Sequence, residues 1–142
     1  MIRGVIENIA RKQQINDFSG VRIGNITPTD LDGAIDYHGK AFIFIEVKLI
    51  GKELPFGQKL FLERIIDAIS DNGKYAVAFV IEHDVQDVTQ SIPCADCYVR
   101  EVYLTKNKKW KKPCKKRTLK NMLNGFIDYV DGKNKTELKI AV

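Results

Sequence analysis

Two apolar runs of strand length constrain this chain more than any other feature. Residues 41–45 read Ala-Phe-Ile-Phe-Ile, and residues 76–81 read Ala-Val-Ala-Phe-Val-Ile. Neither run alternates between apolar and polar residues, which indicates strands that are covered on both faces. Between them, residues 56–70 place apolar side chains at helical spacing, and the Asn72-Gly73 pair ends this predicted helix. A helix that crosses between two doubly buried strands predicts a parallel pair.

The flanking residues add further predicted elements. Ile2 to Gln13 has an apolar stripe at helical spacing, and the turn residues His38-Gly39-Lys40 join a strand ending at Tyr37 to the run that begins at Ala41. Thr118 is placed to cap a last helix. The predicted helices cover residues 2–13, 56–70 and about 118–130, and the predicted strands cover 21–26, about 30–37, 41–48, 74–82, 99–105 and a short stretch near Trp110.

This order of elements predicts an α/β fold with a central mixed sheet flanked on both faces by helices. The length of 142 residues is that of one domain, and the sequence shows no internal repeat and no linker. No apolar run approaches the roughly 20 residues of a membrane span. The N-terminal residues lack a secretory signal, and three cysteines without one indicate reduced thiols, so we expect a cytoplasmic protein without membrane contact.

Four charged residues on the predicted hairpin carry the chemistry. Asp30 and Asp32 are two apart on one strand, and Glu46 and Lys48 are two apart on the next, so each pair shares a face. If the hairpin is symmetric about Gly39, Asp32 lies opposite Glu46 and Asp30 opposite Lys48, with β-carbons about 5 Å apart. This register requires a three-residue turn or a compensating bulge, because a two-residue loop would put the pairs on opposite faces.

Carboxylates at such a separation repel one another unless a proton or a cation lies between them. Hard oxygen ligands suit Mg²⁺ or Mn²⁺, which can polarise a phosphoryl oxygen and lower the pKa of a bound water. A lysine beside them, here Lys48, would orient the attacking water or help to deprotonate it. The pattern therefore points to hydrolysis of phosphodiesters.

The segments Pro28-Thr-Asp30-Leu-Asp32-Gly33 and Phe44-Ile-Glu46-Val-Lys48 resemble the PD-(D/E)xK motif of the restriction-endonuclease-like superfamily. The likeness spans roughly Ile2 to Glu82 and is nearest to small phage or bacterial nucleases related to Holliday-junction resolvases. One departure is that Thr29 intervenes after the proline, so that two aspartates compete for the family position. The resemblance implies an αβββαβ core, a metal site at Asp32 and Glu46 with Asp30 and Val47, a catalytic lysine at Lys48, a helix-borne assisting Gln58 and an auxiliary Glu7.

Simpler interpretations stand beside these assignments. The charged residues of the hairpin could form a salt-bridge cluster in a structural sheet, and Glu7 fits a solvated helix face better than a ligand. Cys94 and Cys97 have the spacing of half a zinc site, but the second half lacks its pair, so incidental or packing thiols are the favoured interpretation.

A basic segment, residues 106–117, follows the predicted strand at 99–105 and contains the short one near Trp110. Lys plus Arg number 23 against 18 for Asp plus Glu, a net charge of +5, and much of the excess is concentrated here. Such a density around the single tryptophan favours a phosphate-binding loop over a merely solvated charge run, although the tryptophan itself fits a packing anchor. The candidate nucleic-acid-binding residues are Lys106, Lys108, Lys109, Trp110, Lys111, Lys112, Lys115, Lys116 and Arg117.

The sequence thus predicts a Mg²⁺- or Mn²⁺-dependent DNase. Two alternatives remain: a non-catalytic nucleic-acid-binding protein of the same fold that uses the basic segment, and an interaction protein with an acidic strand pair. The sequence does not choose between DNA and RNA, between endo- and exonucleolytic cutting, or between oligomeric states. A homodimer would let a single-site chain cut both strands.

Overall fold

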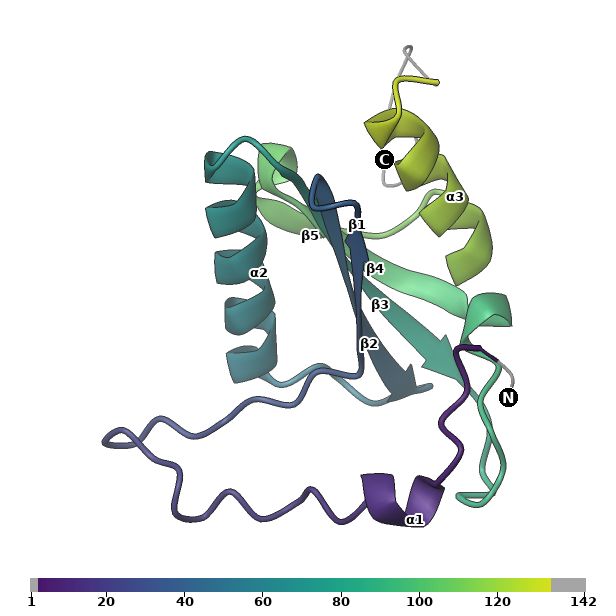
Figure 1. Cartoon of the computed structure of the whole chain (residues 1–142). Helices are drawn as coiled ribbons and strands as arrows, with labels where there is room; N and C mark the ends of the chain where they lie inside the picture. Colours follow the sequence, from purple (N-terminus) through teal and green to yellow (C-terminus); the bar gives the residue numbers. More distant parts are fainter. Residues whose placement is uncertain (1–2, 134–142) are drawn as a thin grey trace. The chain divides into compact units, whose positions relative to one another are not determined.

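The computed structural model describes residues 3–133 of the chain (Figure 1). Contacts between residues divide the chain into two compact units, residues 1–30 and residues 31–142, and each is described by itself. Within the described part of the chain, no helix combines the length and the apolar character that a membrane span requires.

The first unit has little regular structure. Its helix α1 covers only Ile9–Lys12, so the predicted helix over residues 2–13 is wrong in extent, and Ile2 lies outside the described residues. Gly4 adopts a φ of +88°, which an α-helix cannot accommodate. The predicted strand at 21–26 is also wrong, because only an isolated bridge joins Ile23 to Ile26. No residue from 3 to 30 is buried, so the apolar stripe has no packing partner to stabilise a longer helix.

The second unit is built on a five-stranded mixed sheet in the order β1-β2-β3-β4-β5. The pair β2/β3 is parallel, as predicted, and the other three pairs are antiparallel. The strands are β1 (Gly33–Tyr37), β2 (Ala41–Leu49), β3 (Tyr75–His83), β4 (Tyr98–Leu104) and β5 (Lys109–Lys111).

The β1/β2 hairpin has the predicted symmetric register. Gly33 pairs with Ile45 and Tyr37 with Ala41, which leaves a three-residue turn centred on Gly39. Gly39 has a φ of +67°, as the turn requires, and His38 shares the left-handed region with a φ of +54°. The first strand begins at Gly33 and not at Asp30, so the prediction of its start is wrong by three positions.

Helices cover both faces of the sheet, which confirms the predicted α/β architecture (Figure 1). Leu62 and Ile66 of α2 (Phe56–Asp71) pack in a cluster with Phe44 of β2. On the other face, α3 (Leu119–Val130) packs against Ile43, Val77 and Phe79. Figure 1 shows that α2 begins at the end of the sheet where β2 and β3 terminate, so its first turn lies level with the last residues of these strands.

A β-bulge in β4 turns two consecutive charged residues to one face. Val80 pairs with Glu101 and Ile81 with Val99, so Arg100 is an extra residue in the ladder. Val99 and Val102 both belong to the cluster under α3. Arg100 and Glu101 lie between them and therefore both face α2.

The capping of α3 gives a first testable prediction. The side-chain oxygen of Thr118 accepts a hydrogen bond from the backbone N–H of Asn121 at 3.2 Å. Replacing Thr118 with Ala should lower the free energy of unfolding by about 1 kcal/mol, because that N–H loses its partner at the helix start. Urea denaturation monitored by circular dichroism measures the change, and Thr118→Ser, which keeps the hydroxyl, should retain most of the stability.

Candidate active site

The hairpin brings Asp32 and Glu46 together at the end of the sheet. The backbone N–H of Asp32 donates to Oε1 of Glu46 at 3.4 Å, and Oδ2 of Asp32 accepts from the backbone N–H of Val47 at 2.8 Å. The second bond ties the Asp32 carboxylate to β2 just before the ladder of β1 begins. The predicted approach of these two acids is thus observed, and Val47 contributes its N–H to holding the aspartate.

Glu46 is the one buried charged residue of the described chain, with only 2% of its surface exposed. Burial and, after it, the neighbouring charge of Asp32 together raise the pKa of Glu46 from 4.5 to about 7, while Lys48 opposes the shift. The positive charge of Lys48 therefore does not offset the cost of burying this carboxylate beside a second one. A carboxylate in such a setting binds either a proton or a cation.

Lys48 lies on the same face of β2 as Glu46. Phe44 of β2 is buried under α2, and side chains at alternate positions of a strand point to the same face, so Glu46 and Lys48 also face α2. Lys48 is half-buried and is paired across the parallel ladder with Glu82.

Gln58 lies in the first turn of α2 and has an unsatisfied polar atom. Its Oε1 is buried and lacks a hydrogen-bond partner among the described residues. Leu62 and Ile66, four and eight positions further along α2, are buried against the sheet, which puts Gln58 on the same face of the helix. Leaving a buried acceptor unpaired costs about 1–3 kcal/mol. A hydrogen bond from a donor such as water would remove this cost.

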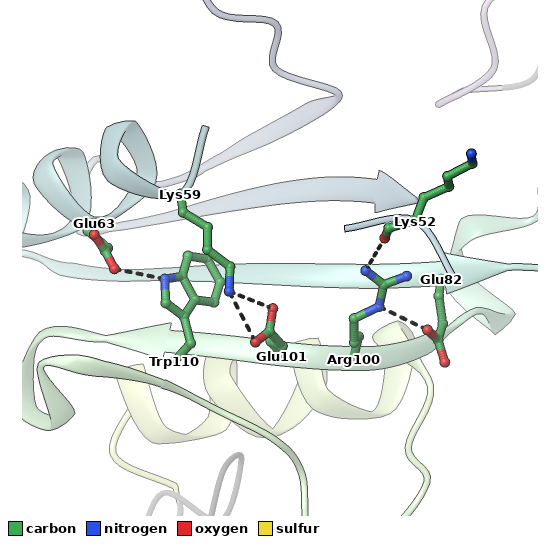
Figure 2. A network of polar contacts seen from close by, with 7 residues as sticks. All are labelled: Lys52, Lys59, Glu63, Glu82, Arg100, Glu101 and Trp110. Atoms are coloured by element: carbon green, nitrogen blue, oxygen red, sulfur yellow. Dashed lines mark hydrogen bonds and ion pairs between the residues drawn. The ribbon is translucent and has the colours of Figure 1, made fainter. Parts of the chain in front are cut away.

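Arg100 and Glu82, which the sequence analysis does not single out, fix the segment that follows Lys48. Figure 2 shows the Arg100 guanidinium between the Glu82 carboxylate, at 2.9 Å, and the carbonyl oxygen of Lys52, at 2.6 Å. A third bond, at 3.3 Å, reaches the carbonyl oxygen of Leu49. Glu82 directly follows an apolar run, just as Glu46 does. The predicted parallel pairing of the two strands could have placed Glu82 beside Lys48, as the register of the sheet does.

A second polar cluster, also drawn in Figure 2, anchors the tryptophan. The indole N–H of Trp110 donates to Glu63 at 3.0 Å, and the Lys59 ammonium lies 5.5 Å from the ring centroid and 3.3 Å from Glu101. The ring also packs against Tyr103 with a centroid distance of 5.5 Å. Trp110 therefore joins α2 to the edge of the sheet, which supports its interpretation as a packing anchor over stacking on a base.

The basic segment forms the outer edge of the sheet. It starts at the end of β4, pairs along β5 and returns to the start of β4, where the backbone N–H of Val99 donates to the carbonyl oxygen of Arg117. Lys108 forms an ion pair with Asp67 at 3.5 Å, and Lys116 lies 5.0 Å from the ring centroid of Tyr98. The exposed lysines of the segment are Lys106, Lys108, Lys109, Lys112, Lys115 and Lys116, whereas Lys111 and Arg117 are half-buried.

The other predicted site residues are not brought into this cluster by the described contacts. Asp30 and Glu7 belong to the first unit and are exposed, so the pairing of Asp30 with Lys48 stays a prediction. Burial raises the pKa of Cys94 and of Cys97, which favours thiols over metal-binding thiolates. Within residues 3–133, no group of three or more His, Cys, Asp or Glu side chains is arranged to hold a metal ion.

Asp32 and Glu46 offer two carboxylates, and Mg²⁺ is commonly held by one or two carboxylates together with water and substrate phosphate. The arrangement can therefore hold a hard cation on the face of β2 that also carries the Lys48 ammonium group. Comparison with known proteins adds no assignment: no family model, no curated protein and no solved structure matches the chain.

Proposed function

We propose that the protein is a Mg²⁺- or Mn²⁺-dependent DNase with its active centre at Asp32, Glu46 and Lys48. The observation that carries the proposal is the buried Glu46 carboxylate beside Asp32: burial and the charge of Asp32 together raise the pKa of Glu46 to about 7. Two neighbouring carboxylates repel each other and do not stabilise the sheet. A bound cation relieves this repulsion. The resemblance of these residues to the PD-(D/E)xK motif supports the same conclusion.

The donors fit a hard divalent cation. The chain presents carboxylate oxygens from Asp32 and Glu46, and the Asp32 carboxylate is already held in place by the N–H of Val47. Mg²⁺ bound there would polarise a phosphoryl oxygen and lower the pKa of a coordinated water. The two thiols closest in sequence to each other, Cys94 and Cys97, are soft ligands and do not suit this ion.

Lys48 and Gln58 supply the remaining roles. The Lys48 ammonium lies on the face of β2 that carries Glu46, where it would stabilise the charge that grows on the phosphorane oxygens. The buried Oε1 of Gln58 can accept a hydrogen bond from the attacking water and so help to orient it. Arg100 holds the segment after Lys48 through the carbonyls of Leu49 and Lys52, and we assign it a positioning role.

The restriction-endonuclease-like fold is part of the proposal. The β1, β2, α2, β3 order and the parallel β2/β3 pair agree with the last part of the αβββαβ core that the resemblance implies. The core would contain a further strand before β1, and the described sheet has none there. Support for this fold therefore rests on the hairpin and on the crossover that follows it.

The basic segment presents exposed lysines along a sheet edge, where they can contact the phosphates of the proposed DNA substrate. Replacing Lys109 and Lys112 with Gln should weaken binding to duplex DNA, because each lost phosphate contact removes about 0.9 from the slope of log affinity against log salt concentration. We expect the slope to fall by about 2 for the pair. Fluorescence anisotropy across a salt series measures it, and the double variant Lys12→Gln/Lys120→Gln, which also removes two exposed lysines, should leave the slope unchanged.

The experiment that tests the function is cleavage of end-labelled duplex, single-stranded and branched DNA in Mg²⁺, Mn²⁺ or EDTA. Cleavage that requires a divalent ion supports the proposal. The exposed lysines of the basic segment favour a second candidate, a non-catalytic nucleic-acid-binding protein. Salt-dependent binding of DNA that remains uncut in every ion would replace the first proposal with this second one.

A further inference from the structure

A pocket of about 310 Å³ lies at the end of the sheet opposite Glu46 and Lys48. Tyr75, the first residue of β3, and Leu104, the last residue of β4, line it, together with residues from the ends of α2 and α3. Figure 1 shows that these element ends lie at the opposite end of the sheet from the start of α2. The pocket opens to solvent and is therefore accessible to a large ligand.

Two tyrosines give the pocket an aromatic wall. The rings of Tyr75 and Tyr129 meet edge to face, with centroids 5.7 Å apart and an interplanar angle of 88°. Tyr75 is 42% exposed, although it lies beside the buried Ala76. An aromatic ring that is held by a neighbour and still partly exposed offers a surface on which a flat, unsaturated group can stack.

The charged side chains of the pocket are cationic. Lys74 and Lys106 line it, both are exposed, and its lining contains no acidic residue. Neither lysine forms an ion pair in the described part of the chain. The hydroxyls of Ser70 and Thr105 also line the pocket, 3.0 Å apart, and the Thr105 hydroxyl donates to the carboxylate of Asp67 at 3.0 Å. Aromatic stacking next to two ammonium groups is the chemistry that recognises a nucleotide: the base on the ring and the phosphates on the lysines.

A second pocket of similar size has a lining of mixed charge. Glu82, Asp84 and Asp96 line it near the end of β3 together with one lysine, Lys116, and Glu82 is paired with Arg100. Of these two pockets, the one at Tyr75 therefore suits an anion better, because its lining has two lysines and no acid.

We propose that the pocket at Tyr75 binds an unpaired nucleotide of the DNA strand whose scissile phosphate lies at Asp32 and Glu46. This inference rests on the proposed function for the identity of the ligand. Glu46 pairs with Val80, five residues along β3 from Tyr75, so at about 3.3 Å per residue the pocket and the acids are roughly 17 Å apart along the strand. The basic segment runs between the two ends of the sheet, from Lys106 at the pocket to Lys116 beside Tyr98, and would follow the phosphates of the same DNA strand.

The test uses photocrosslinking of the full chain to oligodeoxythymidine that carries 5-iododeoxyuridine, in EDTA so that no cleavage occurs. Crosslinks are expected on Tyr75 or Tyr129, identified by mass spectrometry. Tyr75→Ala should weaken binding of the oligonucleotide about 10-fold, whereas Tyr75→Phe, which keeps the ring, should bind like the wild type. Lys74→Gln/Lys106→Gln should lower the single-strand salt slope by about 1.4, and Lys12→Gln/Lys120→Gln should not change it.

Other outcomes separate the pocket from the nuclease. In one outcome the protein cleaves DNA in the presence of metal, but the crosslinks lie elsewhere and Tyr75→Ala binds like the wild type. This outcome would overturn the proposed nucleotide site and leave the proposed nuclease activity intact. Crosslinks on Tyr75 without cleavage in any ion would support the pocket as a nucleotide site and overturn the nuclease. Thermal unfolding of each variant distinguishes a lost contact from a lost fold.

Discussion

Asp32→Asn should reduce metal-dependent DNA cleavage by about a thousandfold, because a metal-bound phosphoryl oxygen is stabilised by several kcal/mol in the transition state. The substitution removes a charge from the proposed ion site, while the amide oxygen can still accept from the N–H of Val47. Lys48→Gln should lower cleavage by about a hundredfold to a thousandfold, the usual cost of removing one group that stabilises developing charge. Initial rates on labelled DNA at saturating Mg²⁺ measure both effects.

Two controls decide whether these losses are specific. Asp71→Asn and Lys120→Gln change the same residue types at exposed positions away from the hairpin and should cleave at the wild-type rate. Binding of DNA in EDTA should persist in Asp32→Asn, because the aspartate is proposed to hold metal and not DNA. Full cleavage by Asp32→Asn or by Lys48→Gln would show that the chemistry lies elsewhere.

Folding raises the pKa of Glu46 from 4.5 to about 7. The metal-free protein should therefore lose stability as the pH rises through this interval. Over this interval the folded protein retains a proton that the unfolded chain has released, so the unfolded state binds fewer protons and a rise in pH favours unfolding. The full effect amounts to about 3 kcal/mol. Glu46→Gln abolishes this titration and should therefore be more stable than the wild type above pH 7 in EDTA.

Urea unfolding at a series of pH values measures this difference. Glu53→Gln, at an exposed position that precedes α2, should follow the wild-type pH profile. Addition of Mg²⁺ at pH 7 should stabilise the wild type and leave Glu46→Gln nearly unchanged, because a ligand stabilises only the form that binds it. A Glu46→Gln variant with the wild-type profile in EDTA would mean that Glu46 does not titrate as its burial requires.

The sheet could be predicted because its strands and crossover helix have strong local patterns. The runs at 41–45 and 76–81 admit few other placements, and Gly39 fixed the hairpin register that brings Asp32 to Glu46. The first 30 residues were predicted poorly, because periodicity alone does not form a helix without a surface to pack on. The start of β1 was misjudged since the aspartates carry no strand signal.

Local sequence patterns did not predict the residues that support the site. Arg100 and Glu101 share a face only because β4 has a bulge, and a bulge leaves little trace in a single sequence. The unsatisfied oxygen of Gln58 and the Trp110 contact with Glu63 likewise depend on how α2 packs on the sheet. Such tertiary contacts join residues far apart in the chain, so spacing alone does not reveal them.

The central claim is that Asp32 and Glu46 form a divalent-cation site that drives DNA cleavage. Its most direct test is a Mn²⁺ titration of the wild type and of Asp32→Asn, with bound Mn²⁺ measured by electron paramagnetic resonance and DNA cleavage measured in the same samples. We expect cleavage by the wild type to rise together with occupancy of one protein-bound Mn²⁺, and Asp32→Asn to lose both. Cleavage that appears without bound Mn²⁺, or an ion that binds Asp32→Asn as tightly as the wild type, would contradict the claim.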